Sequence, residues 1–133
     1  MDAVVADTHT LVWYFESPER LSAVAKQALV NASNLGFPIY ASAITLVELT
    51  YLVEKRRLSA ESVARVEAGI AAPNSAIVIV SVDEPVARAL RRIPRNIVPD
   101  MPDRIIAATA LHLKLPLVTR DEKIHACDIE TIW

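Results

Sequence analysis

The chain has 133 residues, a length that fits one domain with a hydrophobic core of its own. Hydrophobic residues make up 53% of it and the net charge is −2, so there is no overall attraction to nucleic acid and any basic surface must be local. The single cysteine, Cys127, excludes an internal disulfide, and neither a leader pattern nor a long apolar span is found, which indicates a cytoplasmic protein that does not enter the membrane.

Short, nearly continuous apolar segments alternate with helical patterns along the chain, as is typical of parallel strands buried on both faces. In chain order we expect strands at residues 3–6, 38–42, 76–82, 115–119 and 129–133, the last at a sheet edge. The helical patterns cover residues 8–15, 22–33, 44–56, 60–71, 84–93 and 103–114. Strands separated by helices form right-handed crossovers, so we expect one three-layer α/β/α domain over residues 1–133, with a central, mostly parallel sheet of four to five strands.

In open parallel sheets chemistry collects at the carboxyl ends of the strands, and we expect four acidic residues there or close by. Asp7 ends the first strand, Asp121 follows the fourth, and Asp103 opens the last predicted helix. Glu48 shares a helical face with apolar neighbours, where an unpaired carboxylate is costly and needs a cation. Each of the three aspartates also fits a turn, a helix cap or a first-turn acid. We single out Asp100 as a supporting residue outside the main cluster.

If the four acids converge, their repulsion favours the binding of protons or of a hard cation. Two carboxylates about 4 Å apart repel by roughly 4 kcal/mol at an effective dielectric near 20. Oxygen ligands suit Mg²⁺ or Mn²⁺, whereas the scattered His9, His112 and His125 do not offer a zinc-like spacing. With two glycines in the chain, neither a phosphate-binding loop nor a nucleophile elbow is present. An all-carboxylate Mg²⁺ site acting on a phosphodiester is the chemistry that remains.

Three stretches carry a family resemblance that covers essentially the whole chain. They are ADTHTLVWYF at the start, LVELTYL in a middle helix and MPDRIIAATALHLKLPLVTRDEKI near the end. With this spacing the chain resembles PIN domains, and among them the VapC-type toxins of toxin–antitoxin pairs. The family's acidic quartet of catalytic, metal-binding residues maps onto Asp7, Glu48, Asp103 and Asp121. Thr119 matches the hydroxyl residue that often lies two places before the last acid.

The resemblance implies a Mg²⁺-dependent endoribonuclease, with Mn²⁺ able to substitute, that a small cognate antitoxin inhibits. RNA phosphodiesters would be hydrolysed by metal-activated water at the acidic cluster, and Thr119 would orient Asp121. For phosphate contacts, the stretch EPVARALRRIPR places three arginines on one helical face, a pattern that also fits a solvated surface. The candidate RNA-binding residues are Arg88, Arg91 and Arg92, with Arg104 and Arg120, which either contact RNA or pair with the cluster.

The helix of residues 44–56 is apolar on nearly every side, which one sheet does not cover. We therefore expect a two-fold homodimer made through this helix and that of residues 60–71, with Leu49 and Val53 among the apolar side chains at the contact.

The alternative function is a silent interaction module, either a PIN-like fold without catalysis or a receiver-like Mg²⁺-binding domain. A receiver needs an acidic pair after the first strand, and Asp7 has no acidic neighbour. A haloacid-type phosphatase needs Asp-x-Asp, and His9 stands at the second of these positions. Cleavage of mixed RNA that EDTA abolishes would separate the nuclease from these modules.

Overall fold

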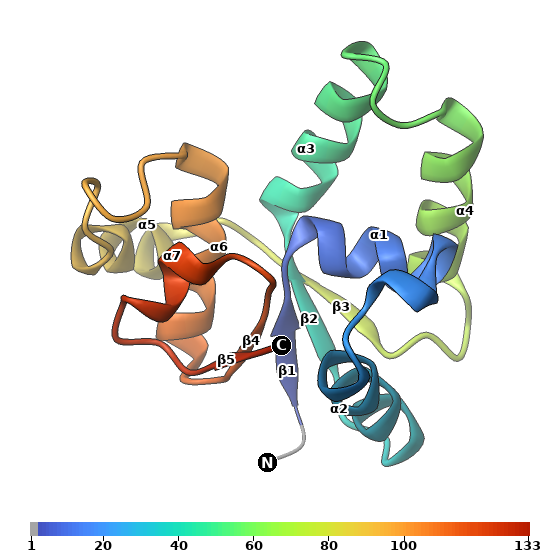
Figure 1. The fold of residues 1–133 in the computed structure, drawn as a ribbon, viewed down its shortest axis with the longest axis horizontal. Helices are drawn as coiled ribbons and strands as arrows, with labels where there is room; N and C mark the ends of the chain where they lie inside the picture. Colours follow the sequence, from blue (N-terminus) through green and yellow to red (C-terminus); the bar gives the residue numbers. More distant parts are fainter. Residues whose placement is uncertain (1–2) are drawn as a thin grey trace.

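The computed structural model describes residues 3–133, and within them five short strands form one sheet (Figure 1). The strands are β1 (Val4–Ala6), β2 (Ile39–Ser42), β3 (Ile77–Val80), β4 (Leu117–Val118) and β5 (Thr131–Ile132). All four neighbouring pairs described are parallel, and the strand order is β3-β2-β1-β4-β5. Each strand lies inside a predicted apolar segment, and the last one is at an edge, as expected.

The helices follow the predicted order with shifted ends. They are α1 (Thr8–Glu16), α2 (Ala23–Asn34), α3 (Ala43–Glu54), α4 (Ala60–Ala71), α5 (Glu84–Ala89), α6 (Met101–Leu113) and α7 (Glu122–His125), with the 3₁₀ turns η1 (Pro18–Arg20) and η2 (Leu90–Arg92). The predicted helix of residues 84–93 therefore changes to a 3₁₀ turn after α5. The predicted start of α6 at Asp103 is wrong, because Asp100 caps the helix and Pro102 fits its first turn. The short helix α7, which Asp121 caps, has no counterpart among the predicted helices.

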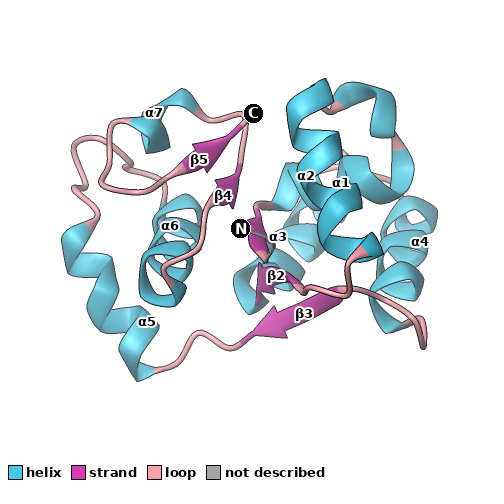
Figure 2. Cartoon of the chain, turned by 90° about the horizontal axis from the view of Figure 1, so that it is seen from below, coloured by secondary structure: helices cyan, strands magenta, loops and turns pink. Residues whose placement is uncertain are grey.

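The sheet is covered on both faces. Val4 and Ala6 belong to a core cluster with α1, α2 and α4, whereas Val5 belongs to a second cluster with α5, α6 and α7. This alternation along a strand explains why β1 is apolar at every position. Both ribbon views show the two sets of helices on opposite sides of the strands (Figures 1 and 2). The predicted three-layer α/β/α fold is confirmed.

The strand order creates a crevice at one end of the sheet. From β1 the chain adds β2 and then β3 toward one edge, and it returns to place β4 on the other side of β1. The order therefore reverses between β1 and β4, and in open parallel sheets ligands bind at the carboxyl ends of the strands at such a point. Asp7 and Thr119 directly follow these two strands.

Other elements of the same chain cover more of helix α3 than the sequence predicted. Leu49 is fully buried within the chain, so its predicted exposure at a dimer contact is wrong: α3 packs against α1, α4 and α6 as well as β2. Val47 and Tyr51 remain 47% and 56% exposed. Within residues 3–133 no helix has the length and apolarity needed to cross a membrane.

Candidate acidic metal site

A cleft of about 970 Å³ opens at the carboxyl ends of β1 and β4. Side chains from α1, α3, α6 and the segment after β4 line it. All four acids of the predicted quartet line this cleft, and Asp100 joins them. The five carboxylates are those of Asp7, Glu48, Asp100, Asp103 and Asp121.

Asp7 is held by hydrogen bonds to both carboxylate oxygens. It caps α1, where Oδ1 accepts from the Thr10 amide at 2.9 Å, and Oδ2 accepts from the Thr119 hydroxyl at 2.5 Å. The fully buried Thr119 hydroxyl also accepts from the Asp121 amide at 3.0 Å. Thr119 therefore orients the carboxylate of Asp7, and it contacts Asp121 through the backbone instead of the side chain. The Asp121 side chain itself caps α7 by accepting from the Lys123 amide at 2.9 Å.

Glu48 reaches the cleft from the half-buried face of α3. The Thr8 hydroxyl donates to its Oε1 at 2.5 Å, and Thr8 lies 3.0 Å from the buried Thr45 hydroxyl. Burial raises the pKa of Glu48, the Thr8 hydrogen bond opposes this rise, and the neighbouring charge of Asp100 adds to it. Two buried threonines thus fix this carboxylate at the edge of the cleft.

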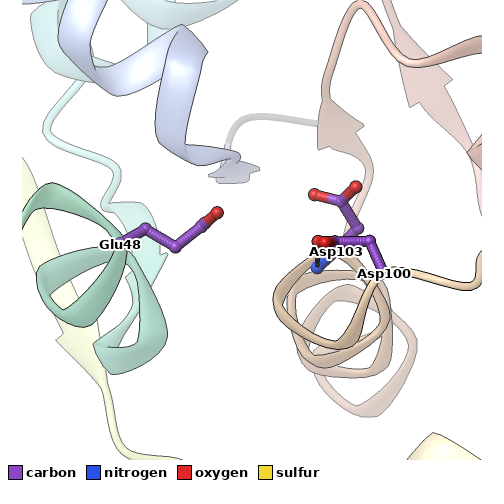
Figure 3. Close-up of side chains that lie close together, drawn as sticks. All are labelled: Glu48, Asp100 and Asp103. Carbon is purple, nitrogen blue, oxygen red and sulfur yellow. Dashed lines mark hydrogen bonds between the residues drawn. The ribbon is translucent and has the colours of Figure 1, made fainter. Parts of the chain in front are cut away.

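Asp100 and Asp103 lie opposite Glu48 at the start of α6 (Figure 3). The Asp100 carboxylate accepts from the Asp103 amide at 3.1 Å, as an N-cap does. One carboxylate oxygen from each of these three residues lies within 4.8 Å of the others. The prediction of Asp100 as an outlying supporter therefore understates its place, because its carboxylate lies in the cluster beside Asp103.

The electrostatics of the cluster follow from burial and mutual repulsion. The pKa of Asp103 is raised to about 7, chiefly by burial and then by the charges of Asp100, Glu48, Asp121 and Asp7. A divalent cation would reverse these unfavourable interactions, and carboxylate oxygens are the donors that Mg²⁺ and Mn²⁺ prefer. The residues present therefore fit a hard divalent metal ion.

The predicted arginines do not all reach this cleft. The Arg104 guanidinium donates to the carbonyl oxygens of Ile93, at 2.8 and 3.2 Å, and of Leu90, at 3.1 Å, which ties α6 to the preceding segment. Arg88 pairs with Glu84 at 2.8 Å on the exposed side of α5. Arg120 is exposed and lines the cleft.

Three further basic residues line the cleft, although the sequence analysis did not predict them as RNA contacts. They are Arg20, Lys55 and Arg57. For Lys55 a sequence signal exists, because it follows Glu48 by seven residues and so falls on the same helical face. For Arg20 and Arg57, in turns, helical spacing offers no such signal.

The chain is similar in sequence or in fold to several known proteins. Ribonuclease VapC22 of Mycobacterium tuberculosis is 29% identical over 126 residues, which cover 95% of this chain and 92% of that protein. FitAcB from Neisseria gonorrhoeae has a similar structure, with a TM-score of 0.63 and 26% identity over 96% of this chain and 95% of the other. VapBC2 from Rickettsia felis, solved with a promoter DNA fragment, gives a TM-score of 0.73 at 15% identity over 98% and 99% of the two chains. The PIN domain model matches residues 4–130, so the chain belongs to the PIN domain family.

Proposed function

We propose that this protein is an endoribonuclease of VapC type, the toxin of a type II toxin–antitoxin pair, and that it depends on Mg²⁺. The observation that carries the proposal is the meeting of five carboxylates in one cleft at the switch point of the sheet, three of them with oxygens within 4.8 Å of one another. The similarity to Ribonuclease VapC22 over nearly the whole chain supports the ribonuclease activity.

The acidic residues would hold one or two divalent ions. Glu48, Asp100 and Asp103 offer the closest set of oxygens, and Asp7 and Asp121 add donors from β1 and the segment after β4. When bound, Mg²⁺ lowers the pKa of a coordinated water and stabilises negative charge on a phosphodiester. Mn²⁺ prefers similar oxygen donors and would substitute.

The chain's own groups supply positioning. The Thr119 hydroxyl and the Thr10 amide orient Asp7, and the Thr8 hydroxyl orients Glu48. Burial of these threonine side chains keeps their hydrogen bonds away from competing water. The substrate phosphate would therefore meet carboxylates that are already placed, which lowers the cost of assembling the site.

Cleavage of a mixed single-stranded RNA pool tests the proposal. We expect Mg²⁺-dependent cleavage with 5′-phosphate products, abolished by EDTA and by Asp7→Asn or Asp103→Asn. Asp83→Asn is the matched control, because Asp83 caps α5 away from the cleft and asparagine also caps helices. A protein that cleaves equally well in EDTA, or an Asp103→Asn variant with wild-type activity, would contradict the metal site. A folded protein with no cleavage at all would favour the silent interaction module.

We also propose a small antitoxin partner. A toxin–antitoxin complex from Klebsiella pneumoniae and the VapBC structures from Salmonella typhimurium and Mycobacterium tuberculosis contain chains with a similar fold, which supports this partner. The antitoxin would lay an apolar segment over the helices near the cleft and send a basic side chain to the carboxylates. Co-expression of the neighbouring gene should abolish cleavage, and unchanged activity of a purified complex would contradict this inhibition.

A homodimer made through α3 and α4 is proposed on the exposed apolar side chains of α3. Val47 and Tyr51 lie four residues apart on one face of α3 and are 47% and 56% exposed, so they form an apolar patch there. We expect sedimentation at micromolar concentration to give twice the chain mass, and Val47→Glu to halve it. Val24→Glu is the control, since Val24 is 60% exposed on α2. A wild-type monomer, or equal effects of both variants, would contradict the α3 contact.

A further inference from the structure

Besides Arg120, three basic side chains line the acidic cleft. Arg20, Lys55 and Arg57 line the same cavity as the five carboxylates, whereas Arg88, Arg91 and Arg92 do not. We infer that Arg20, Lys55 and Arg57 form a phosphate-binding wall that holds the RNA backbone beside the phosphate to be cut. This inference rests on the proposed action on RNA, and it names the residues that give a negatively charged protein its affinity for that substrate.

Helix geometry sets the distance between this wall and the acids. Glu48, Tyr51, Leu52 and Lys55 all line the cleft and follow one another at helical spacing along one face of α3. Seven residues correspond to about 10 Å along the helix axis. Lys55 is therefore too far along α3 to neutralise the phosphate at the carboxylates, and its ammonium is placed for a neighbouring phosphate.

The turn after α3 brings a second cation to the same place. Lys55 is the C-cap of α3, Arg56 adopts a left-handed conformation with φ 58°, and the Arg57 amide donates to the Leu52 carbonyl at 2.8 Å. The chain thus reverses within one residue and returns Arg57 to the cleft. Arg56 itself does not line the cleft. A left-handed non-glycine residue is uncommon, and here it is what separates the two cleft-lining cations.

Arg20 is held on the α1 side of the cleft by an aromatic ring. Its guanidinium lies 4.8 Å from the centroid of the Trp13 ring, within the range of a cation–π interaction. Trp13 in turn packs against His9 and Trp133, with ring centroids 5.7 and 5.9 Å apart. This packing restrains the arginine without using its N–H donors on a protein carboxylate, so the donors stay available for phosphate oxygens.

The distribution of ion pairs favours this wall over the arginine stripe predicted from sequence. Within residues 3–133 the ion pairs found are Arg65–Glu16 and Arg88–Glu84, and neither uses a cation of the cleft. Arg88 is already paired with an acid four residues away, which weakens its field at a phosphate. Arg20, Lys55 and Arg57 instead line the same cleft as the acids, which repel RNA, so binding of the RNA backbone there needs their positive charge.

Binding of fluorescein-labelled single-stranded RNA, measured by anisotropy across a salt series, tests the inference. All variants carry Asp103→Asn and the buffer contains EDTA, so RNA is not hydrolysed. We expect Lys55→Gln with Arg57→Gln to weaken binding tenfold or more and to lower the salt slope by about 1.4, because each phosphate that is no longer neutralised lowers it by about 0.7. Adding Arg20→Gln should lower the slope again by about 0.7.

The matched control replaces the arginines of the off-cleft stripe, Arg88, Arg91 and Arg92, by glutamine. It removes one charge more than the double variant, yet affinity and slope should stay close to those of the parent. Lys55 and Arg57 are both exposed, so the melting temperature of the double variant should equal that of the parent. The double variant therefore tests the inference even if replacement of Arg20 impairs folding.

Four results would overturn the inference: a parent that does not bind RNA, a double variant within twofold of the parent, an unchanged slope, or an equal loss of affinity in the control. The nuclease proposal and the phosphate-binding wall can each fail without the other. A protein that binds RNA through this wall but never cleaves it with Mg²⁺ would refute the proposed function and leave the wall intact. If the protein cleaves RNA but the salt slope of RNA binding does not change when these cations are replaced, the wall alone is refuted.

Discussion

Replacement of Asp103 by asparagine should make the metal-free protein more stable while it abolishes cleavage. Asparagine keeps the size of the side chain and removes one charge from a group of five carboxylates. The pKa of Asp103 is raised from its usual 3.8 to about 7, mainly by burial. Ionisation therefore opposes folding, and a residue that never ionises avoids this cost.

The magnitude follows from proton linkage. Each pKa unit corresponds to about 1.36 kcal/mol, so a rise of about three units corresponds to about 4 kcal/mol at most. Asp103 is only partly buried, and solvent screening reduces this to about 2 kcal/mol. Below pH 4 the carboxyl is protonated in both the folded and the unfolded protein, so the variant gains nothing there. The gain grows as the pH rises from 4 to 7 and is constant above 7.

Urea unfolding in EDTA at pH 4.5, 6 and 8 measures this dependence. We expect the free energy of unfolding of Asp103→Asn to exceed that of the parent by about 2 kcal/mol at pH 8, and by much less at pH 4.5. Asp83→Asn, a cap exchange on α5, should differ from the parent by less than about 0.5 kcal/mol at every pH.

Addition of Mg²⁺ should reverse the order of stabilities. At a free Mg²⁺ concentration 100 times the dissociation constant, a bound ion stabilises the parent by about 2.7 kcal/mol, and the variant should lose most of this gain. The reasoning is refuted if Asp103→Asn is less stable than the parent at pH 8 in EDTA, or if the difference between them does not vary with pH.

Three further predictions concern the supporting structure. Thr119→Val should lower Mg²⁺ affinity about 10- to 100-fold by calorimetry, because Asp7 loses its hydroxyl donor. Thr109→Val, which removes a buried hydroxyl within α6, should leave that affinity unchanged, and an equal effect of both would reject the explanation. Gly69→Ala would place a Cβ 2.4 Å from the Phe15 ring. It should reduce the free energy of unfolding by about 1 kcal/mol, because overpacking costs about 1–3 kcal/mol and the higher helix propensity of alanine offsets about 1. Phe15→Leu should cancel this loss, and a loss that persists in the double variant would contradict the overpacking explanation. Chelation of the parent with EDTA should lower its melting temperature more at pH 8 than at pH 6, and a constant shift would argue against ionised carboxylates as the ligands.

The fold could be predicted in outline because its signals are local. An apolar run such as VVA at β1 is a property of consecutive residues, and both faces of that strand are buried. The shifted start of α6 shows the limit of such signals. Asp100 and Asp103 both suit a helix start, and the choice between them depends on which side chain accepts the free amide, a geometric contact between residues three apart.

For the site, the sequence is enough to identify the acids and the family pattern in which they occur. Asp7, Glu48 and Asp121 could be singled out because each is an acid at the end of an apolar strand or inside an apolar helix, where a charge is costly without a partner.

Which groups share the cleft with these acids depends on how the elements pack in three dimensions. Strand order brings β4 beside β1 although more than 100 residues separate Thr119 from Asp7, and only then can the hydroxyl of one orient the carboxylate of the other. Two cations of the basic wall have the same origin, because Arg20 and Arg57 are ordinary turn residues in the sequence and reach the cleft only when α1 and α3 pack together. Convergence of this kind depends on the packing of elements distant in the chain, and no spacing along the sequence encodes it.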